Sequence, residues 1–204
     1  MVSDTRAGQV ALVTGGSAGL GLAIATALAN TGTAVVLTGR SADRCERAAA
    51  QVSAVTGRAA VGRACDVTDE AAVAGLAGWV LDRFGRLDVL VTSAGVQARG
   101  TIGELSVATL RACLEVNVVG TWLACRAAAE PMRAAGYGRI VTLASALGLV
   151  GAAARAGCFL DSEVPLRRWA APDELASAAL LLTDPSSAYL TGVILPVDGG
   201  WTAH

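Results

Sequence analysis

The sequence predicts an α/β fold, a doubly wound parallel sheet of about six strands with helices on both faces. Short apolar runs alternate with helical patterns along the whole chain, and right-handed crossovers turn that alternation into a three-layer α/β/α arrangement. The 204 residues, 53% of them hydrophobic, suit one domain with a sizeable core, 1–204. A glycine-rich turn after the first apolar run is the third indication.

The first half of the chain predicts three strands and three helices. Asn30-Thr31-Gly32 ends the first helix, Ser41 suits an N-cap of the second, and Asp69 and Glu70 favour the first turn of the third. The predicted strands are Val10–Val13, Ala34–Leu37 and Ala59–Ala64, and the helices are Leu20–Ala29, Ser41–Val55 and Thr68–Phe84.

The second half continues the alternation. Ser106 is expected to cap a long helix through Met132, strained near Pro131, and Pro172 begins a helix that reaches Leu182. The remaining predicted strands are Leu87–Val91, Ile140–Leu143 and Gly192–Val197. No repeat or linker marks a second domain.

Composition excludes several kinds of chemistry. All 16 basic residues are arginines and the one histidine is His204, so a lysine Schiff base, a P-loop lysine and an internal Ser-His-Asp triad are excluded. A net charge of −1 argues against nucleic acid as a partner. The uncharged stretch from Ala7 to Gly39 is broken by glycines, which disfavours a membrane span, and no signal peptide pattern precedes it. We expect a cytoplasmic protein.

The five cysteines form no CxxC pair, and with no internal histidine we expect no metal site. We interpret them as buried small hydrophobic residues in a reducing compartment. They are Cys45, Cys65, Cys113, Cys125 and Cys158.

The glycine-rich turn Thr14–Gly21 joins the first strand to the first helix. Glycines permit a tight turn and close approach to a pyrophosphate, which the helix N-terminus attracts. A purely structural turn is the alternative. At the end of the second strand Arg40 follows Gly39 where an acid would bind a ribose 2′-hydroxyl, so the sequence favours NADP(H), with NAD(H) possible. Arg40 also fits a solvated loop residue.

The TGxxxGxG spacing of Thr14–Gly21 resembles the short-chain dehydrogenase/reductase family, whose fold is Rossmann-like. Further similar motifs follow in the family's order: Cys65-Asp66-Val67, Thr92-Ser93-Ala94-Gly95, Glu115-Val116-Asn117-Val118, the segment 139–145 ending in Ser145, and the segments 164–169 and 197–201.

The resemblance implies an oxidoreductase that interconverts a ketone and a secondary alcohol. It assigns Ser145 and Asn117 to catalysis, as a substrate hydrogen-bond donor and the organiser of a proton-relay water. Ser145 also fits an ordinary loop serine, Asn117 a polar interruption of a helix, and Asp66 a cap near Thr68. The implied cofactor-binding residues are Thr14, Gly15, Ser17, Gly19, Leu20, Gly21, Arg40, Asp66, Val67, Ala94 and Gly95.

The chain departs from the family at its Tyr-x-x-x-Lys pair. The family spacing from Ser145 places Cys158 at the tyrosine position and Ser162 at the lysine position. Tyr137 and Tyr189 lie in segments that match other family elements. The family acid is therefore absent; Cys158 is an alternative acid or nucleophile only if a cation such as Arg155 activates it.

The family also has about fifty more residues here, with a catalytic helix, a sixth strand and a substrate loop, whereas the bridge 158–163 is too short for a strand–helix–strand crossover. Either the protein has lost this segment, or its working form has a segment that this chain lacks. Without it the last strand must pair with the fifth or leave an open edge. We also expect the long helix to expose Leu110, Cys113, Leu114, Trp122 or Leu123.

Two functions remain open: an NADP(H)-dependent oxidoreductase impaired in this chain, or a dinucleotide-binding scaffold without redox activity. The substrate class is a small carbonyl compound or alcohol, and its identity is not readable without the substrate loop. The helix Asp173–Leu182 and the strand Gly192–Val197 resemble a family dimer surface, so we expect a homodimer or homotetramer.

Overall fold

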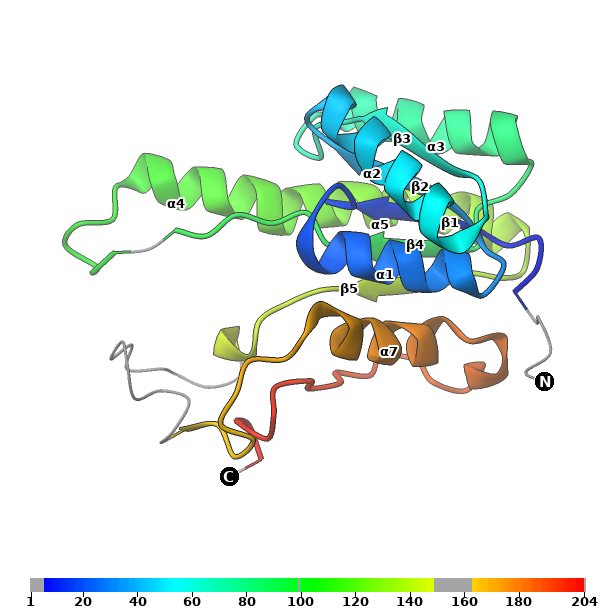
Figure 1. Cartoon of the computed structure of the whole chain (residues 1–204). Helices are drawn as coiled ribbons and strands as arrows, with labels where there is room; N and C mark the ends of the chain where they lie inside the picture. The colour runs from blue at the N-terminus through cyan, green and yellow to red at the C-terminus, as the bar shows by residue number, and fades with distance from the viewer. Residues whose placement is uncertain (1–5, 99, 149–162, 204) are drawn as a thin grey trace.

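The computed structural model describes residues 6–98, 100–148 and 163–203, and it confirms the doubly wound α/β fold. Parallel strands form a single sheet with the order β3-β2-β1-β4-β5, so the chain turns back between β3 and β4 and leaves β1 in the middle (Figure 1). The strands are β1 (Val10–Thr14), β2 (Ala34–Gly39), β3 (Ala60–Ala64), β4 (Val89–Thr92) and β5 (Arg139–Thr142).

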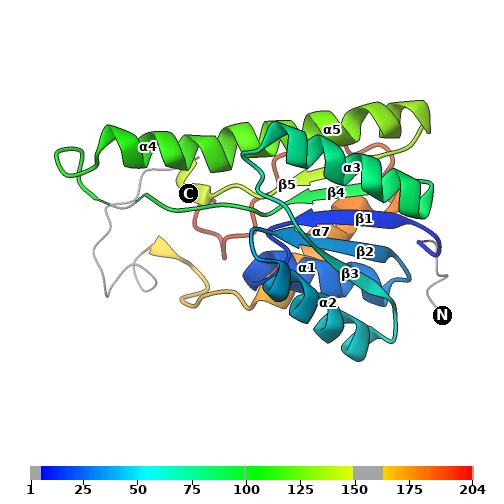
Figure 2. The same cartoon turned by 90° about the horizontal axis from the view of Figure 1, so that it is seen from above.

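Helices cover both faces of the sheet (Figure 2). On one face lie α1 (Gly19–Asn30), α2 (Ala42–Thr56) and α7 (Pro172–Thr183); on the other lie α3 (Glu70–Phe84) and a long helix made of α4 (Val107–Leu114), a π-helical turn (Glu115–Gly120) and α5 (Thr121–Ala134). Alternation along β1 divides the core: Ala11 and Val13 pack towards α1, and Val10 and Leu12 towards α3 and α5.

The predicted N-caps Ser41 and Ser106 are confirmed, whereas the third helix begins two residues later than predicted. The Ser41 hydroxyl accepts a hydrogen bond from the Arg44 N–H, and the Ser106 hydroxyl accepts one from the Thr109 N–H, as expected of N-caps. The third helix begins at Glu70 rather than Thr68, because the Asp69 carboxylate caps the Ala72 N–H.

The predicted last strand is wrong. Residues 192–197 form no strand in the described part of the chain, and the described sheet has five strands rather than about six. A strand requires a ladder partner, and β5 pairs only with β4 among the described elements. Pro196 also lacks the N–H that a central strand donates. Of the two expected outcomes for the last strand, pairing with the fifth strand is not found, and no described strand lies on the outer side of β5.

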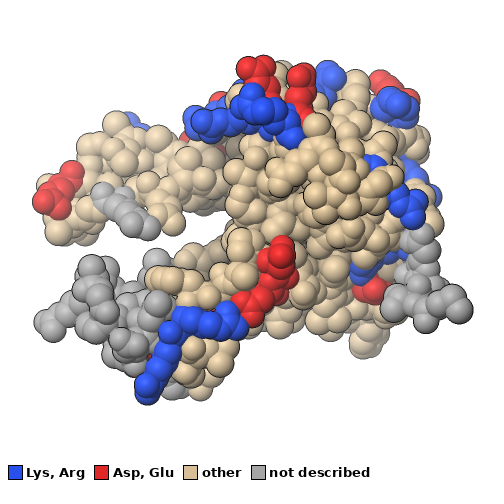
Figure 3. Space-filling model, in the orientation of Figure 1, with Lys and Arg blue, Asp and Glu red and all other residues tan. Residues whose placement is uncertain are grey.

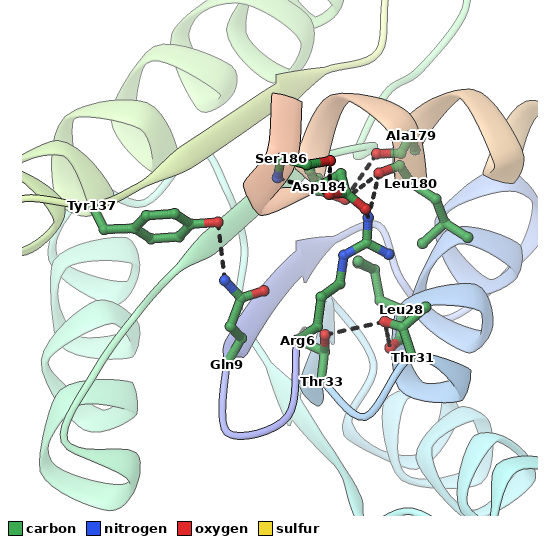
Figure 4. A network of polar contacts seen from close by, with 11 residues as sticks. Arg6, Gln9, Leu28, Thr31, Thr33, Tyr137, Ala179, Leu180, Asp184 and Ser186 are labelled. Atoms are coloured by element: carbon green, nitrogen blue, oxygen red, sulfur yellow. Dashed lines mark hydrogen bonds and ion pairs between the residues drawn. The ribbon is translucent and has the colours of Figure 1, made fainter. Parts of the chain in front are cut away.

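The start of the described chain is tied to the end of α7 (Figure 4). The buried Arg6 guanidinium donates to the Leu180 carbonyl at 2.6 Å and to the Asp184 carboxylate at 2.8 Å. Beside it, the Gln9 amide donates to the Tyr137 hydroxyl at 2.9 Å, which links the residue before β1 to the turn before β5 (Figure 4). These contacts close the edge of the sheet at which the strands begin.

The long helix exposes an apolar stripe, as predicted. Leu110, Leu114 and Trp122 are 45%, 49% and 55% exposed, whereas Leu123 is buried against the sheet. The stretch Val107–Ala134 is the described helix that is long and apolar enough to cross a membrane by length and composition alone, which is weak evidence for a span. Burial is confirmed for Cys45 and Cys65 but not for Cys113 and Cys125, which are half-buried. Cys158 lies outside the described residues.

Candidate functional site

The predicted site residues gather at the edge where the parallel strands end. Backbone hydrogen bonds join the loops there: the Ser93 N–H donates to the Thr14 carbonyl at 3.1 Å, and the Cys65 N–H donates to the Gly39 carbonyl at 2.9 Å. The sheet order reverses on the two sides of β1, and such a switch point opens a crevice between β1 and β4. This edge is the place where an α/β sheet binds ligands.

Gly15 sets the shape of the turn after β1. Its φ of +64° is left-handed, and a Cβ atom there would lie 2.6 Å from the Ala94 nitrogen and 2.7 Å from the Ser93 carbonyl oxygen. The turn after β1 therefore lies directly against the loop after β4. The Thr14 hydroxyl strengthens the join by accepting a hydrogen bond from the Ala94 N–H at 3.3 Å. Only glycine satisfies both the conformation and the contact.

The start of α1 presents backbone donors to this crevice. A Cβ on Gly21 would lie 2.4 Å from the Gly15 carbonyl oxygen, so Gly21 lets the helix fold tightly over the turn. The residue before the helix, Ala18, supplies no side-chain cap, and a Cβ on Gly19 would meet no atom within 4 Å. The first N–H groups of α1 thus receive no cap from Ala18, and they form the positive end of the helix dipole.

Three side chains surround the ends of β2 and β3. The Ser17 hydroxyl lies 3.2 Å from the position of a Cβ on Gly39, and Arg40 is exposed immediately after it. Asp66 accepts hydrogen bonds at one oxygen from the Thr68 N–H (3.0 Å) and the Thr68 hydroxyl (2.8 Å). These bonds lower the pKa of the Asp66 carboxyl, with a smaller contribution from the Arg40 charge. Asp66 therefore holds the loop as an ionised group and keeps a negative charge close to Arg40.

Val67 is buried rather than turned to the crevice. A Cβ on Gly120 would lie 2.7 Å from the Val67 Cγ2 atom, so the π-helical turn packs directly on the loop after β3.

Asn117 clamps the loop after β4. Its amide oxygen accepts a hydrogen bond from the Val96 N–H at 2.8 Å, and its amide nitrogen donates to the Val96 carbonyl at 2.9 Å. The Cys113 sulfur lies 3.4 Å from the same amide nitrogen and 3.6 Å from the Val96 carbonyl oxygen. Asn117 sits in the π-helical turn, which the sequence reasoning missed together with the partners Val96 and Cys113. The one available signal was the four-residue spacing of Cys113 and Asn117 on a predicted helix.

Ser145 lies three residues beyond β5 and is exposed at the same edge of the sheet. Its carbonyl accepts a hydrogen bond from the Gly148 N–H at 2.9 Å, which closes the 3₁₀ turn Ala146–Gly148. Tyr137 is at the opposite edge, before β5 begins, where Gln9 and Arg139 contact it. Tyr189 follows Ala188, which lines a surface pocket with Gly138 and Arg139 at that opposite edge. Cys158 and Ser162 lie outside the described residues.

The residues present fit the adenosine and pyrophosphate parts of a dinucleotide. The crevice combines a turn with no room for side chains, uncapped N–H groups of α1 and an arginine at the end of β2. Hydrogen-bonding side chains from Asn117 and Ser145 lie further along the edge, beyond β4 and β5. Within the described residues no cluster of His, Cys, Asp or Glu suits a metal ion.

Comparison with known families gives two matches that together cover residues 9–202. The model described as short chain dehydrogenase matches residues 9–157, and the model described as enoyl-(acyl carrier protein) reductase matches residues 153–202. The two matches meet between β5 and α7.

Relatives are similar along almost the whole chain. A D-threitol dehydrogenase of Mycolicibacterium smegmatis is 34% identical over 243 aligned positions, which cover 96% of this chain and 93% of the relative. A cis-4-hydroxycyclohexanecarboxylate dehydrogenase of Sinomonas cyclohexanicum is 33% identical over 99% of this chain and 100% of the relative. Because 243 aligned positions exceed the 204 residues of the chain, the first relative contains residues without a counterpart here.

Solved structures share the fold. A short-chain type dehydrogenase/reductase from Mycobacterium marinum superposes with a TM-score of 0.93 at 25% identity over 98% of both chains. An NAD⁺-bound xylitol dehydrogenase superposes with a TM-score of 0.87 at 27% identity, over 96% of this chain and 99% of the other.

Proposed function

The chain belongs to the short-chain dehydrogenase family of oxidoreductases, and from that premise we propose that it binds NADP(H) to interconvert a small ketone and a secondary alcohol. The chemical step is impaired in the chain as it stands. The dehydrogenases of threitol, xylitol and hydroxycyclohexanecarboxylate among its relatives support a small alcohol as the substrate class.

The contact of Gly15 with Ser93 and Ala94 carries the binding proposal. It joins the turn after β1 to the loop after β4 without side chains, next to the N-terminus of α1, which Ala18 does not cap. A pyrophosphate fits there because its charge is met by several backbone donors and the helix dipole. Thr14, Gly15, Ser17, Gly19, Leu20 and Gly21 would hold the phosphates, with Asp66, Val67, Ala94 and Gly95 shaping the two sides of the site.

Arg40 supports NADP(H) over NAD(H). It is exposed at the end of β2, where a 2′-phosphate on the adenosine ribose would meet its guanidinium. Fluorescence titration should show tighter binding of NADPH than of NADH, and Arg40→Asp should reverse or abolish the difference. Asp43→Asn, an exposed change at the start of α2, is the control. Equal binding of both cofactors before and after the Arg40 change would show that Arg40 faces solvent only.

The chain's own residues cover part of the chemical step. The nicotinamide ring of a bound cofactor supplies or accepts the hydride. Ser145 donates a hydrogen bond to the substrate oxygen, and Asn117, by holding Val96, fixes the loop that carries Gly95 and positions water for proton relay. Neither group delivers a proton near neutral pH, because a serine hydroxyl and an amide are far too weakly acidic.

The missing acid sets the expected rate. The chain has no lysine, and both described tyrosines lie away from the crevice. Loss of general acid catalysis typically costs ~10²–10⁴-fold. With NADPH and model ketones we expect turnover far below the enzyme median of about 10 s⁻¹. A turnover near that median would overturn this part of the proposal, and its loss in Cys158→Ala would then identify the acid. In a longer form with the family's Tyr-x-x-x-Lys segment, activity should return and Ser145→Ala should impair it strongly.

A dinucleotide-binding protein without redox activity is the second candidate, favoured by the same absence of lysine. Tight NADPH binding with no turnover on any tested ketone, even with added general acids, would support it over the impaired enzyme.

We further propose a cytoplasmic homodimer or homotetramer. The exposed stripe Leu110, Leu114, Val118 and Trp122 on the long helix supports association, since soluble proteins usually cover such faces. Light scattering at micromolar concentration should give a mass above the 20.4 kDa of one chain, and Trp122→Glu should lower it. A monomer mass for the unaltered chain would contradict this assembly.

A further inference from the structure

The thiol of Cys113 lies where α4 meets the loop after β4. The structure describes α4 in full, and Cys113 is its only residue that is not exposed. The Cys113 sulfur lies 3.4 Å from the side-chain nitrogen of Asn117 and 3.6 Å from the Val96 carbonyl oxygen. Asn117 follows four residues later in the long helix, and both side chains contact the same loop residue.

The sulfur completes the hydrogen bonds of the Asn117 amide. The amide oxygen accepts from the Val96 N–H at 2.8 Å, and one of the two amide N–H groups donates to the Val96 carbonyl at 2.9 Å. The second N–H group has the Cys113 sulfur as its acceptor, and the S–H group in turn donates to the Val96 carbonyl. A reversed amide would place its N–H groups against the Val96 N–H. This set of donors and acceptors therefore fixes one orientation of the amide.

The orientation of the Asn117 amide decides where the loop after β4 lies. Its oxygen is 3.5 Å from the position of a Cβ on Gly95. One residue earlier, the Ala94 N–H donates to the Thr14 hydroxyl at 3.3 Å. The loop is thus attached to the turn after β1 at Ala94 and to the long helix at Val96. Gly95 lies between these attachments, so a shift of Val96 moves it relative to the crevice.

The contact joins neutral groups on a largely uncharged part of the surface. In Figure 3 the visible face of α4, at the upper left, carries its charge mainly near the tip. Salt screens charges and has little effect on hydrogen bonds between a thiol, an amide and a carbonyl. The net contribution of one such bond corresponds to about a threefold to tenfold change in an equilibrium constant.

We propose that Cys113 is a positioning residue for cofactor binding: its thiol fixes the Asn117 amide and, through it, the backbone at Gly95 and Val96. The inference rests on the proposed dinucleotide site and adds to it a residue that acts through Asn117. Without the sulfur, the second amide N–H has no acceptor among the described residues. The amide can then rotate, and the loop after β4 loses part of its order.

The variant Cys113→Ala tests the positioning role. NADPH should bind about threefold to tenfold more weakly in fluorescence titration, at low and at high salt alike. In ¹H–¹⁵N spectra of the cofactor-free chain, one of the two Asn117 side-chain protons should shift and exchange faster with water. The Val96 amide should lose hydrogen-exchange protection. Cys113→Ser should restore most of the affinity, because a hydroxyl donates and accepts as the thiol does.

Two comparisons separate positioning from a merely structural role. Cys125→Ala is the matched control, since Cys125 is also half-buried on the long helix but packs against the core. It should leave the Asn117 signals and the NADPH affinity unchanged. In an Asn117→Ala background, Cys113→Ala should weaken binding no further, because the residue through which it acts is already gone. Circular dichroism checks that each variant is folded.

Several results would overturn the positioning role. One is unchanged NADPH affinity and unchanged Asn117 signals in Cys113→Ala. Others are a Cys113→Ser variant as weak as Cys113→Ala, and losses that simply add in the double variant with Asn117→Ala. Failure of the proposed function is a different result: the unaltered chain would then bind no NADPH at all, whereas normal binding that Cys113→Ala leaves intact contradicts the positioning role alone.

Discussion

The five-stranded part of the molecule and the stretch after β5 differ in how completely they satisfy their backbones. All residues of β1 and β4 are buried, and each lies between two paired neighbours. Residues 192–197 are all exposed and form no ladder with any residue that the structure describes, although their sequence is equally rich in β-branched and apolar residues. The difference teaches that strand propensity becomes a strand only where a partner edge is in reach.

Among the proposed variants, the largest loss of stability is expected within the five-stranded sheet, whose strands all have paired neighbours. Gly15→Ala places a Cβ 2.6 Å from the Ala94 nitrogen in a left-handed conformation, so the β1 and β4 loops must separate. We expect the free energy of unfolding to fall by about 3 kcal/mol and NADPH binding to be lost. Urea denaturation and fluorescence titration measure the two effects.

Gly8→Ala is the matched control for that change. Gly8 also has a positive φ, +84°, but its Cβ would meet no atom within 4 Å, so only the conformational cost of about 1 kcal/mol remains. Equal losses in the two variants would show that the contact with Ser93 and Ala94 contributes nothing, and the comparison between the two parts would weaken.

The second-largest loss of stability is expected where the start of the described chain is hydrogen-bonded to the end of α7. Arg6 is buried and binds Leu180 and Asp184 at the end of α7 (Figure 4), so Arg6→Ala leaves a cavity and removes one donor from the Leu180 carbonyl and one from the half-buried Asp184 carboxylate. We expect a loss of about 2 kcal/mol in urea denaturation. Arg133→Ala removes an exposed pair with Glu130 and should cost at most about 0.5 kcal/mol. If Arg6→Ala is as mild as Arg133→Ala, α7 is held by apolar packing alone.

The five-stranded sheet could be predicted well from the sequence, because its central strands are buried on both faces. β1 and β4 are continuous apolar runs buried on both faces, so their pattern is unambiguous, and the positions of Gly15 and Gly21 follow from the turn between strand and helix. The residues predicted to bind the cofactor, among them Ser17, Arg40, Asp66 and Ala94, therefore lie at one edge of the sheet.

The remaining features depend on contacts between distant residues. The π-helical turn lies within a regular helical sequence pattern. In the structure, Asn117 of this turn is hydrogen-bonded to Val96, and Gly120 packs on Val67. Val67, which the family resemblance assigns to the cofactor site, has its side chain buried beneath Gly120, a contact that its own sequence neighbours do not indicate. The segment 192–197 has a strand's pattern but pairs with no strand in the described part of the chain. None of these depends on local sequence alone.

The smallest effect is expected in the exposed part, at the start of α7. The Glu174 carboxylate accepts two hydrogen bonds from Arg168, both at 2.7 Å, and one from the Ala171 N–H at 2.8 Å. The bonds from Arg168, then that from Ala171, lower the pKa of Glu174 from 4.5 to about 2. Since the folded pKa is below the unfolded one, the carboxylate stabilises the helix start above pH 4.5, and this contribution disappears as the pH falls towards 2.

The matching measurement is hydrogen exchange at the first amides of α7 together with a ¹³C titration of the Glu174 carboxyl. Protection should hold constant between pH 7 and 5 and fall at lower pH, whereas Glu174→Gln should show weaker protection that does not change over this range. Arg168→Gln should raise the pKa of Glu174 towards its ordinary value, because the largest cause of the shift is removed. The protection of β1 should not change in either variant, because the satisfied sheet does not depend on this cap. A Glu174 carboxyl that titrates near 4.5 in the unaltered chain would contradict this prediction. It would mean that the bonds from Arg168 and Ala171 do not persist in solution, so that the stretch after β5 is even less ordered relative to the sheet.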